Sequence, residues 1–324
     1  MVDPVVGATT AEKPSVLHPL VVIVGPTASG KTSLALKLAE QFDGEIVSCD
    51  AVAVYRGLDV GSAKPTAAER ARVPHHAVDI LNADEASTAG DYARAARAAL
   101  TEIKARGRLP IVTGGTGLYL RALLEGLAPA PPRDEEMRER LRERATRNGP
   151  EYLHRLLKRL DPAAAAMIHP NDVPKVIRSV EVTLAARQPQ SEQWRAGRDR
   201  LQGFRVLQMG LNPPRVGLYA RINERAARMF DEGLLEETQT ARARYGDACR
   251  ALGSLGYAQA VAMLRGEMTR AEAIAAAQQG HRNYAKRQMT WFRRDKQIEW
   301  LAGFGDDADV QARAAEIVRG QVTG

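Results

Sequence analysis

A glycine-rich turn near the N-terminus constrains the fold of this chain more than any other feature. It follows the run Leu20–Val24, whose Leu, Val and Ile side chains are typical of a strand buried in a parallel sheet. It leads into a helical pattern over 30–40, and residues 25–32 between the two match G-x-x-x-x-G-K-[ST]. The sequence therefore predicts a P-loop in an α/β fold, with a parallel sheet flanked by helices.

The P-loop predicts a binding site for a polyphosphate and a divalent cation. Its glycines allow backbone N–H groups to converge on a phosphate, and the helix N-terminus adds partial positive charge. Lys31 supplies a full charge, and the Thr32 hydroxyl can ligate Mg²⁺. A turn that binds nothing is the disfavoured alternative, because strand, helix, Lys and Thr occur together. The predicted phosphate-binding residues are Gly25, Pro26, Thr27, Ala28, Ser29, Gly30, Lys31 and Thr32.

Composition limits the classes of partner and compartment. The net charge is +7 and the pI about 9.5, which favours an anionic partner such as nucleic acid, although a generally basic proteome explains it equally well. Cys49 and Cys249 are too few for a disulfide framework or a cysteine zinc site, which suits a reducing cytoplasm. No apolar run approaches membrane-spanning length, and residues 1–17 are expected to form a loose tail.

Two further strands are expected to end at the same edge of the sheet as the P-loop strand. One covers 44–50 and ends in Asp50, and the other covers 109–113 and leads into a second glycine-rich turn, Gly114–Gly117. Ligands of open α/β sheets bind at the carboxyl ends of the strands, so Asp50 is expected to face the P-loop cavity. An equal alternative is that Asp50 only caps the next turn.

Residues 75–81 form a possible third strand that opens with His75 and His76. Metal binding by this pair is disfavoured, because no third ligand follows at a useful spacing. A helix rich in Ala and Arg is predicted over 88–106, with Thr88 as its cap.

The composition changes at the proline-rich stretch 129–132, and the residues that follow have no β pattern. Charge and cap signals predict helices over 133–147, 150–159, 162–168 and 172–187. Strand character returns at 203–211. The expected divisions are a tail at 1–17, the first part of a P-loop core at 18–129, an all-helical insertion at 130–196 and the second part of the core at 197–324.

A helical pattern near 270–295 combines positive charge with an aromatic side chain. Its expected core stripe is Ala285, Met289 and Phe292. The basic residues fall on neighbouring strips: Arg282, Lys286 and Arg293 on one, and Arg287 and Arg294 beside Trp291 further round. Such a face suits a nucleic-acid backbone and a stacked base, and a solvated basic helix is the alternative. A last strand near 297–301 and a helix near 307–320 are expected after it.

Arg221 and Arg225 lie four residues apart in a helix expected to open at 221, and therefore on one face. They either clamp a phosphate or face solvent. The chain lacks an Asn-Lys-x-Asp guanine motif and a clear apolar strand that ends in Asp-Glu. A phosphate cradle, an acid at the next strand end and a basic aromatic helix together suit transfer of a group from a diphosphate donor to a nucleotide.

The ordered motifs of the chain resemble the tRNA dimethylallyltransferases (isopentenyl-tRNA transferases, MiaA type). The resemblance covers about residues 18–301 and implies a P-loop NTPase-like sheet with an all-helical insertion domain. The P-loop alone is common to many enzymes, whereas the last segment and the order of the set are specific. The motifs are the P-loop, Ser48-Cys49-Asp50, 55–65, 114–119, His169-Pro170-Asn171-Asp172, Leu255-Gly256-Tyr257 and 284–292.

The resemblance implies transfer of a dimethylallyl group from dimethylallyl diphosphate to N6 of adenosine 37 in tRNA. The P-loop would hold the donor's diphosphate, which leaves with the help of Mg²⁺, and ATP would not be needed. Asp50 would take the proton of the amine, and Thr116 would hydrogen-bond near the bridging oxygen. Lys31, Mg²⁺ on Thr32, and Arg225 would neutralise the leaving group.

The resemblance also implies an RNA-binding side, where a flipped adenine enters from the anticodon loop and the insertion closes over that loop. Ala51 and Ala53 stand where the family usually has Ser and Gln, and Ala258 where a basic residue is common. The residues expected on the tRNA side are Asp50, Ala51, Val52, Ala53, Pro174, Lys175, Arg178, Gly256, Tyr257, Arg282, Lys286, Arg287, Gln288, Thr290, Trp291 and Arg293.

Two competing hypotheses remain from the sequence. One is a small-molecule kinase that binds ATP at the P-loop, and the other is an RNA-binding P-loop protein without catalysis. The protein is expected to be cytoplasmic, without membrane contact. Nothing in the sequence demands a dimer, so a monomer is expected.

Overall fold

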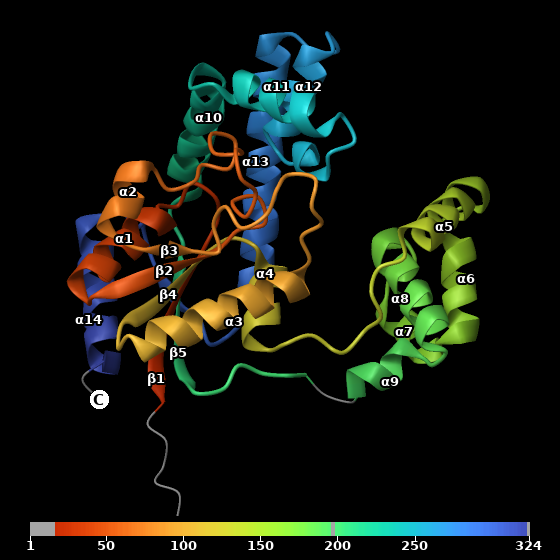
Figure 1. Cartoon of the computed structure of the whole chain (residues 1–324), viewed down its shortest axis with the longest axis horizontal. Helices are drawn as coiled ribbons and strands as arrows, with labels where there is room; N and C mark the ends of the chain where they lie inside the picture. The colour runs from red at the N-terminus through yellow and green to blue at the C-terminus, as the bar shows by residue number, and fades with distance from the viewer. Residues whose placement is uncertain (1–16, 196–197, 323–324) are drawn as a thin grey trace, which may run out of the picture. The chain divides into compact units, whose positions relative to one another are not determined.

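The computed structural model describes residues 17–195 and 198–322. Within them a six-stranded sheet has the order β3-β2-β4-β1-β5-β6, and every neighbouring pair is parallel (Figure 1). The predicted parallel α/β fold is therefore confirmed, while the expected tail lies outside the described residues except for Leu17. The strands are β1 (His18–Val24), β2 (Gly44–Cys49), β3 (His75–His76), β4 (Leu109–Gly114), β5 (Phe204–Leu211) and β6 (Glu299–Leu301).

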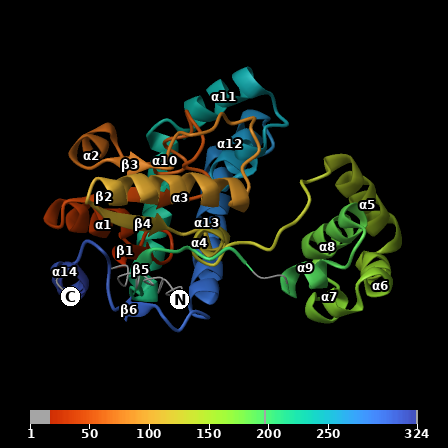
Figure 2. The ribbon, with the colours of Figure 1, turned by 60° about the horizontal axis from the view of Figure 1, so that its bottom comes forward.

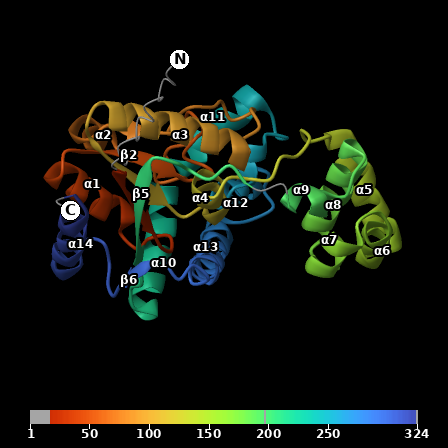
Figure 3. The same ribbon diagram turned by 90° about the horizontal axis from the view of Figure 1, so that it is seen from below.

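Helices cover both faces of the sheet, because the side chains of each strand alternate between the two faces. On one face, Ile23 and Ile111 share a buried core with Leu34 of α1 (Lys31–Gln41) and Val318 of α14 (Ala308–Val322). Figure 3 shows α1 and α14 on one side of β5, and α4 (Gly117–Leu124) and α13 (Arg270–Phe292) on the other. The helix α3 (Ala89–Ala105) packs on β2 and β4 and is capped by Thr88 as predicted.

A helical lobe stands beside the loop that follows β2. It contains α10 (Arg215–Asp231), α11 (Leu234–Tyr245), the 3-10 turn η1 (Arg250–Gly253) and α12 (Tyr257–Leu264). Leu58 of the loop is buried in one core with Met229 and Tyr257, and Figure 2 shows the loop between β2 and α2 (Ala67–Arg72) beside α12.

The helices α2, α11 and α12 were not predicted from the sequence, and α10 begins six residues before the expected start at Arg221. The helix α10 begins at Arg215 because Pro214, its N-cap, ends the preceding extended segment. In α11 the buried positions are Leu234, Thr238 and Ala241, which is too weak an apolar stripe to stand out among charged neighbours.

The strand β3 contains only His75 and His76, although a strand was predicted over 75–81. Ala77 and Asp79 have φ values of 58° and 56°, so the chain leaves the extended conformation there. The buried Lys64 amine holds Asp79 at 2.6 Å. The turn brings the chain back over the end of β2, where the backbone N–H of Ile80 donates to Val54 at 2.9 Å.

Residues Leu124–Arg200 form a compact unit of their own, which extends beyond the expected 130–196 at both ends. Its predicted helices lie within two residues of the observed ones, while the last helix was not predicted; residue 196 lies outside the described residues. Asp161 is buried and caps α7, accepting the backbone N–H of Ala164 at 3.0 Å. The helices are α5 (Glu135–Asn148), α6 (Pro150–Leu160), α7 (Pro162–Met167), α8 (Val173–Ala186) and α9 (Gln190–Arg195).

In the part of the chain that the structure describes, no helix has the length and apolarity needed to cross a membrane.

Candidate functional site

A cavity of about 970 Å³ lies at the carboxyl ends of β1, β2 and β4. The P-loop follows β1, Asp50 follows β2, and the turn with Gly115 and Thr116 follows β4, so parallel strands bring three loops to one edge of the sheet. The helices α10 and α13 close another side. Asp50 and the P-loop therefore line the same cavity, as the strand pattern predicted, and residues 27–32 are the part of the P-loop that reaches it.

The backbone gives the P-loop its shape. Gly30 is the N-cap of α1 and has a φ of 85°, in the left-handed region that favours glycine. A Cβ at this position would lie 2.7 Å from the backbone nitrogen of Gly305. Gly305 donates that N–H to the carbonyl of Ser29 at 2.9 Å. The segment after β6 thus contacts the P-loop through its backbone.

Lys31 is the charged side chain of the P-loop, and its surroundings shift its pKa. Its amine donates to the carbonyl of Pro26 at 2.7 Å. Burial, with a further contribution from Arg225, lowers the pKa of Lys31 to about 7, and Asp50 partly opposes this effect. The amine is therefore about half protonated at neutral pH, and negative charge from a bound diphosphate would favour its charged form.

The two arginines of α10 have different partners. Arg225 donates from Nη2 to the hydroxyl of Thr27 in the P-loop, and burial lowers its pKa. Arg221 instead pairs with Asp306 at 2.6 Å, and its guanidinium lies 3.7 Å from the ring centre of Phe304. Both arginines line the cavity, but of the two only Arg225 bonds to the P-loop.

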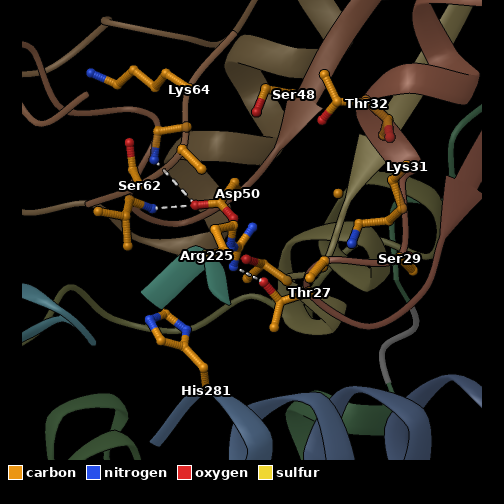
Figure 4. Close-up of a pocket in the computed structure, with 18 of the residues that line it drawn as sticks. Thr27, Ser29, Lys31, Thr32, Ser48, Asp50, Ser62, Lys64, Arg225 and His281 are labelled. Atoms are coloured by element: carbon orange, nitrogen blue, oxygen red, sulfur yellow. Dashed lines mark hydrogen bonds between the residues drawn. The ribbon is translucent and has the colours of Figure 1, made fainter. Parts of the chain in front are cut away.

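Thr32 is exposed on the wall of the cavity, and Figure 4 shows its hydroxyl on the same side as that of Ser48. No group of three His, Cys, Asp or Glu side chains that could hold a metal occurs among residues 17–195 and 198–322. A cation at Thr32 would need oxygens of a bound polyphosphate as further ligands, which is the usual way that Mg²⁺ is held. The residues present therefore fit a metal that arrives with its diphosphate.

Asp50 both caps a turn and faces the cavity, so the two readings of its sequence position are compatible. Its Oδ1 accepts the backbone N–H groups of Val52 at 2.8 Å and Ala53 at 3.2 Å (Figure 4). Thr116 steadies the same turn, because its Oγ1 accepts the N–H of Ala51 at 3.1 Å. These bonds fix the carboxylate and engage one of its oxygens, and Oδ2 has no hydrogen-bond partner within the described chain.

Gln288 joins two of the three loops. Its Oε1 accepts the N–H of Thr27 at 2.7 Å, and its Nε2 donates to the carbonyl of Gly115 at 3.0 Å. Gly115 must be glycine, since a Cβ there would lie 1.9 Å from Nε2. Gln288 is only 4% exposed, so its amide is committed to the protein. The expected tRNA contact of this residue is not available without breaking these bonds.

The other residues expected to contact tRNA divide by exposure. On α13, Lys286, Arg287, Thr290 and Trp291 are exposed, followed by the exposed Arg293, whereas Arg282 is half-buried and bonded to Asn223. Tyr257 is fully buried and donates to Glu237 at 2.6 Å, Ala53 is buried, and Gly256 is the N-cap of α12. In the second unit Pro174 and Lys175 are exposed, and Arg178 pairs with Glu181 at 2.9 Å.

Two histidines on the cavity wall were not predicted as site residues. His75 donates from Nδ1 to the carbonyl of Val73 at 2.8 Å, and its Nε2 is buried with no partner among the described residues. His281 of α13 is 7% exposed, and neither of its ring nitrogens has a partner there. No motif marks His281 in the sequence. His76 pairs with Glu45 at 2.6 Å, and the two belong to no group of three possible metal ligands among the described residues.

The fold and the cavity define an α/β protein in which a P-loop sequence with a buried lysine and arginine shares a cavity with a carboxylate. The sequence pattern of the family described as IPP transferase matches residues 53–295, and the pattern described as isopentenyl transferase matches residues 18–79. The chain belongs to the IPP transferase family.

Named relatives cover nearly the whole described chain. The tRNA dimethylallyltransferase of Koribacter versatilis is 61% identical over 300 residues, which are 93% of this chain and 98% of that protein. The tRNA dimethylallyltransferase of Solibacter usitatus is 50% identical over 301 residues, 93% of this chain and 98% of that one. The crystal structure of the tRNA isopentenylpyrophosphate transferase of Bacillus halodurans matches with a TM-score of 0.70 and 37% identity, covering 94% and 97% of the two chains.

Proposed function

We propose that this protein transfers a dimethylallyl group from dimethylallyl diphosphate to the N6 amine of adenosine 37 in tRNA, releasing diphosphate. The names of the relatives support this activity. The observation that carries it is that Asp50, Lys31 and Arg225 line one cavity. A reaction that joins an amine to a carbon bearing diphosphate needs a base and an anion cradle on opposite sides of that carbon.

The acceptor half of the reaction falls to Asp50. The amine of adenine is a poor nucleophile, because its lone pair is conjugated with the ring. The N–C bond forms as the amine gives a proton to the carboxylate, and Oδ2 is the oxygen in place to take it. The turn that holds Oδ1 fixes the direction of approach.

The donor half falls to the P-loop and Arg225. The C–O bond to diphosphate breaks as the N–C bond forms, and the allylic carbon bears positive charge on the way. Lys31, Arg225 and the P-loop N–H groups stabilise the departing diphosphate. Thr116 accepts the N–H of Ala51 and lies within hydrogen-bonding reach of Tyr284, and its hydroxyl is proposed to donate to the bridging oxygen when the donor is bound. Mg²⁺ held by Thr32 and the diphosphate would add positive charge to the leaving group.

The RNA side rests on the exposed face of α13. Lys286, Arg287 and Arg293 provide charge for the phosphate backbone, and Trp291 provides a stacking surface. Adenosine 37 must leave its stack to reach Asp50. The exposed Pro174 and Lys175 and the half-buried Arg178 are proposed as further contacts from the second unit. We further infer that the protein acts in the cytoplasm as a monomer.

Transfer of radiolabel tests the proposal. The protein is incubated with Mg²⁺, unmodified tRNA and carbon-labelled dimethylallyl diphosphate, without ATP. Label that stays with the tRNA and digests to N6-(dimethylallyl)adenosine is the expected result. Unlabelled tRNA, with ATP consumed in a parallel assay on small acceptors, would favour the P-loop kinase. Tight tRNA binding without either reaction would favour a binding protein.

A further inference from the structure

His281 is a polar group that the fold buries without giving it a partner. The side chain projects from α13 into the cavity that Asp50 and Arg225 also line, and it is 7% exposed. Both ring nitrogens are buried, and neither has a hydrogen-bond partner in the described chain. Burying such nitrogens costs free energy that packing alone does not recover. A group left in this state on the wall of a substrate cavity points to a ligand.

The neighbours of His281 on the same helix face are already committed within the protein. Tyr284, one turn on, donates to the carbonyl of Gly115 at 3.4 Å, and Gln288, two turns on, joins Gly115 to the P-loop. Seven residues of α-helix span about 10 Å, so His281 lies about that far along α13 from the P-loop contact. His281 is thus the one of these three residues whose polar atoms remain for a substrate.

Its place along the helix favours the acceptor over the diphosphate. In Figure 4 the imidazole points from α13 toward Arg225, and Lys31 lies on the far side of Arg225. The preceding Gly280 packs closely on Leu255, since a Cβ on it would lie 2.7 Å from the Leu255 side chain. Residues 253–255 line the same cavity. His281 therefore lies beside this turn, with its imidazole directed toward Arg225 and not toward Lys31.

The chemistry of the imidazole fits a base better than an anion. Burial, with a further contribution from Arg225, lowers the pKa of His281 to about 4, so the ring is neutral at physiological pH. A neutral imidazole has one N–H donor and one bare nitrogen. A purine offers acceptor ring nitrogens next to its amine. A neutral donor also adds no positive charge opposing the charge that develops on the allylic carbon.

We propose that His281 binds the acceptor base, donating a hydrogen bond to a ring nitrogen of the adenine whose N6 amine faces Asp50. The contact would orient the flipped base and would discriminate against bases that lack an acceptor at that position. This assignment rests on the proposed function and adds a specificity residue to it.

A cycle of enzyme and substrate changes tests the contact. The substrates are anticodon stem-loops that carry adenosine, 1-deazaadenosine, 3-deazaadenosine or 7-deazaadenosine at the target position. The enzymes are the wild type, His281→Ala, and Asn283→Ala as a control on the exposed side of α13. Each replacement of a ring nitrogen by C–H also changes the reactivity of the N6 amine, and this change is the same for every enzyme. The contact is therefore measured by how the effect of an analogue differs between enzymes.

One of the three analogues lacks the ring nitrogen that His281 contacts. In the wild type and in Asn283→Ala, this analogue is expected to lower kcat/KM by about tenfold more than it does in His281→Ala, because the buried imidazole N–H loses its acceptor. The KM for dimethylallyl diphosphate should stay within about twofold in His281→Ala, since a lost base contact does not reach the cradle. Identical analogue effects in all three enzymes would overturn the proposal. A rise confined to the donor KM would overturn it too, by placing His281 on the diphosphate.

Two further results distinguish a failed contact from a misfolded variant and from a failure of the proposed function. If His281→Ala does not fold, His281→Phe takes its place in the comparison, because its ring fills a similar volume and donates no hydrogen bond. If the wild type does not modify the adenosine stem-loop at all, the proposed function itself fails, which is a different outcome from the loss of discrimination.

Discussion

The P-loop and the Asp50 turn lie at the same edge of one sheet, but they are held in different ways. Within the P-loop, Lys31 donates to Pro26 at 2.7 Å, and the N–H of Ser29 donates to the same carbonyl at 3.3 Å. The Asp50 turn depends on distant parts of the chain. Thr116 holds Ala51 from 65 residues away, and the N–H of Asp79 donates to the carbonyl of Ala53 at 3.1 Å.

The difference matters for catalysis as well as for folding. The P-loop takes its shape from its own backbone and the start of its own helix, with further support from Gln288 and Gly305 in distant parts of the chain. The Asp50 carboxylate is held by the next residues of its own turn, and that turn is placed by Thr116 and Asp79 from other loops. Substitutions on the two sides should therefore separate donor binding from proton removal, and the predictions below test that separation.

The largest effect is expected for Asp50→Asn. Asn keeps an oxygen that can accept the N–H groups of Val52 and Ala53, so the turn should survive, but the amide cannot take a proton. We expect transfer to fall by about 10²–10⁴-fold in single-turnover assays. Inhibition by pyrophosphate should be unchanged, because the substitution leaves the bonds of Lys31 and Gln288 in the P-loop in place. Full activity in Asp50→Asn would show that another group is the base.

A smaller loss is expected for Arg225→Gln. Arg225 is the buried cation that reaches the P-loop through Thr27, so its removal takes charge from the leaving group. We expect kcat to fall by about 10²–10³-fold, together with weaker pyrophosphate inhibition. Arg221→Gln is the matched control on the same helix, where the partly exposed pair with Asp306 predicts a change below about fivefold. Equal losses in both variants would contradict the assignment of Arg225 alone to the cradle.

Much of the fold could be predicted from the sequence wherever the signal is local. The apolar run of β1, the P-loop and α1 follow one another along the chain, and α3 begins at the cap that Thr88 provides. The helices of the insertion followed from charge and cap residues. These features depend on neighbours within a few turns, which a sequence pattern records directly.

The rest depends on contacts between distant residues, which no pattern in one sequence reveals. β3 is short because of the left-handed turn at Ala77 and the ion pairs of Asp79. Gln288 was read as part of a basic RNA-binding face, yet it faces inward and joins two loops. His281 carried no signal at all, because its significance lies in the absence of a partner in the folded protein.

The pH dependence of diphosphate binding tests whether Lys31 contributes its charge to the P-loop. With a pKa of about 7, Lys31 of the free protein is charged below that pH and neutral above it. Bound diphosphate favours the charged amine, so binding takes up a proton above pH 7 and none well below it. Pyrophosphate affinity should therefore fall by up to about tenfold per pH unit above 7.

Calorimetry in buffers of different ionisation enthalpy measures this proton uptake. Lys31→Arg is the control, because its guanidinium stays charged and leaves only the titration of the ligand itself. The wild type should take up more protons than Lys31→Arg at pH 8, and the same number at pH 5.5. If the wild type and Lys31→Arg took up the same number of protons at pH 8 as well as at pH 5.5, Lys31 would be charged in the free protein at both pH values.

The smallest effect is expected for Tyr257→Phe, which weakens the remote support of the loop after β2. The buried Tyr257 hydroxyl donates to Glu237 at 2.6 Å, and Glu237 accepts the N–H groups of Asp59 and Val60 at 2.6 Å and 3.0 Å. We expect the free energy of unfolding to fall by about 1–2 kcal/mol, measured by urea denaturation.

Tyr245→Phe, at the end of α11 in the same lobe, is the matched control for that variant. Its side chain is half-buried and its contact with Arg244 is through the ring, which Phe retains, so its stability should match the wild type. Pyrophosphate inhibition should be the same in both variants, because the Tyr257 hydroxyl bonds to Glu237 and not to the P-loop. A weakened cradle in Tyr257→Phe would show instead that the two sides of the site are coupled through the sheet, and the separation between local and remote support would fail.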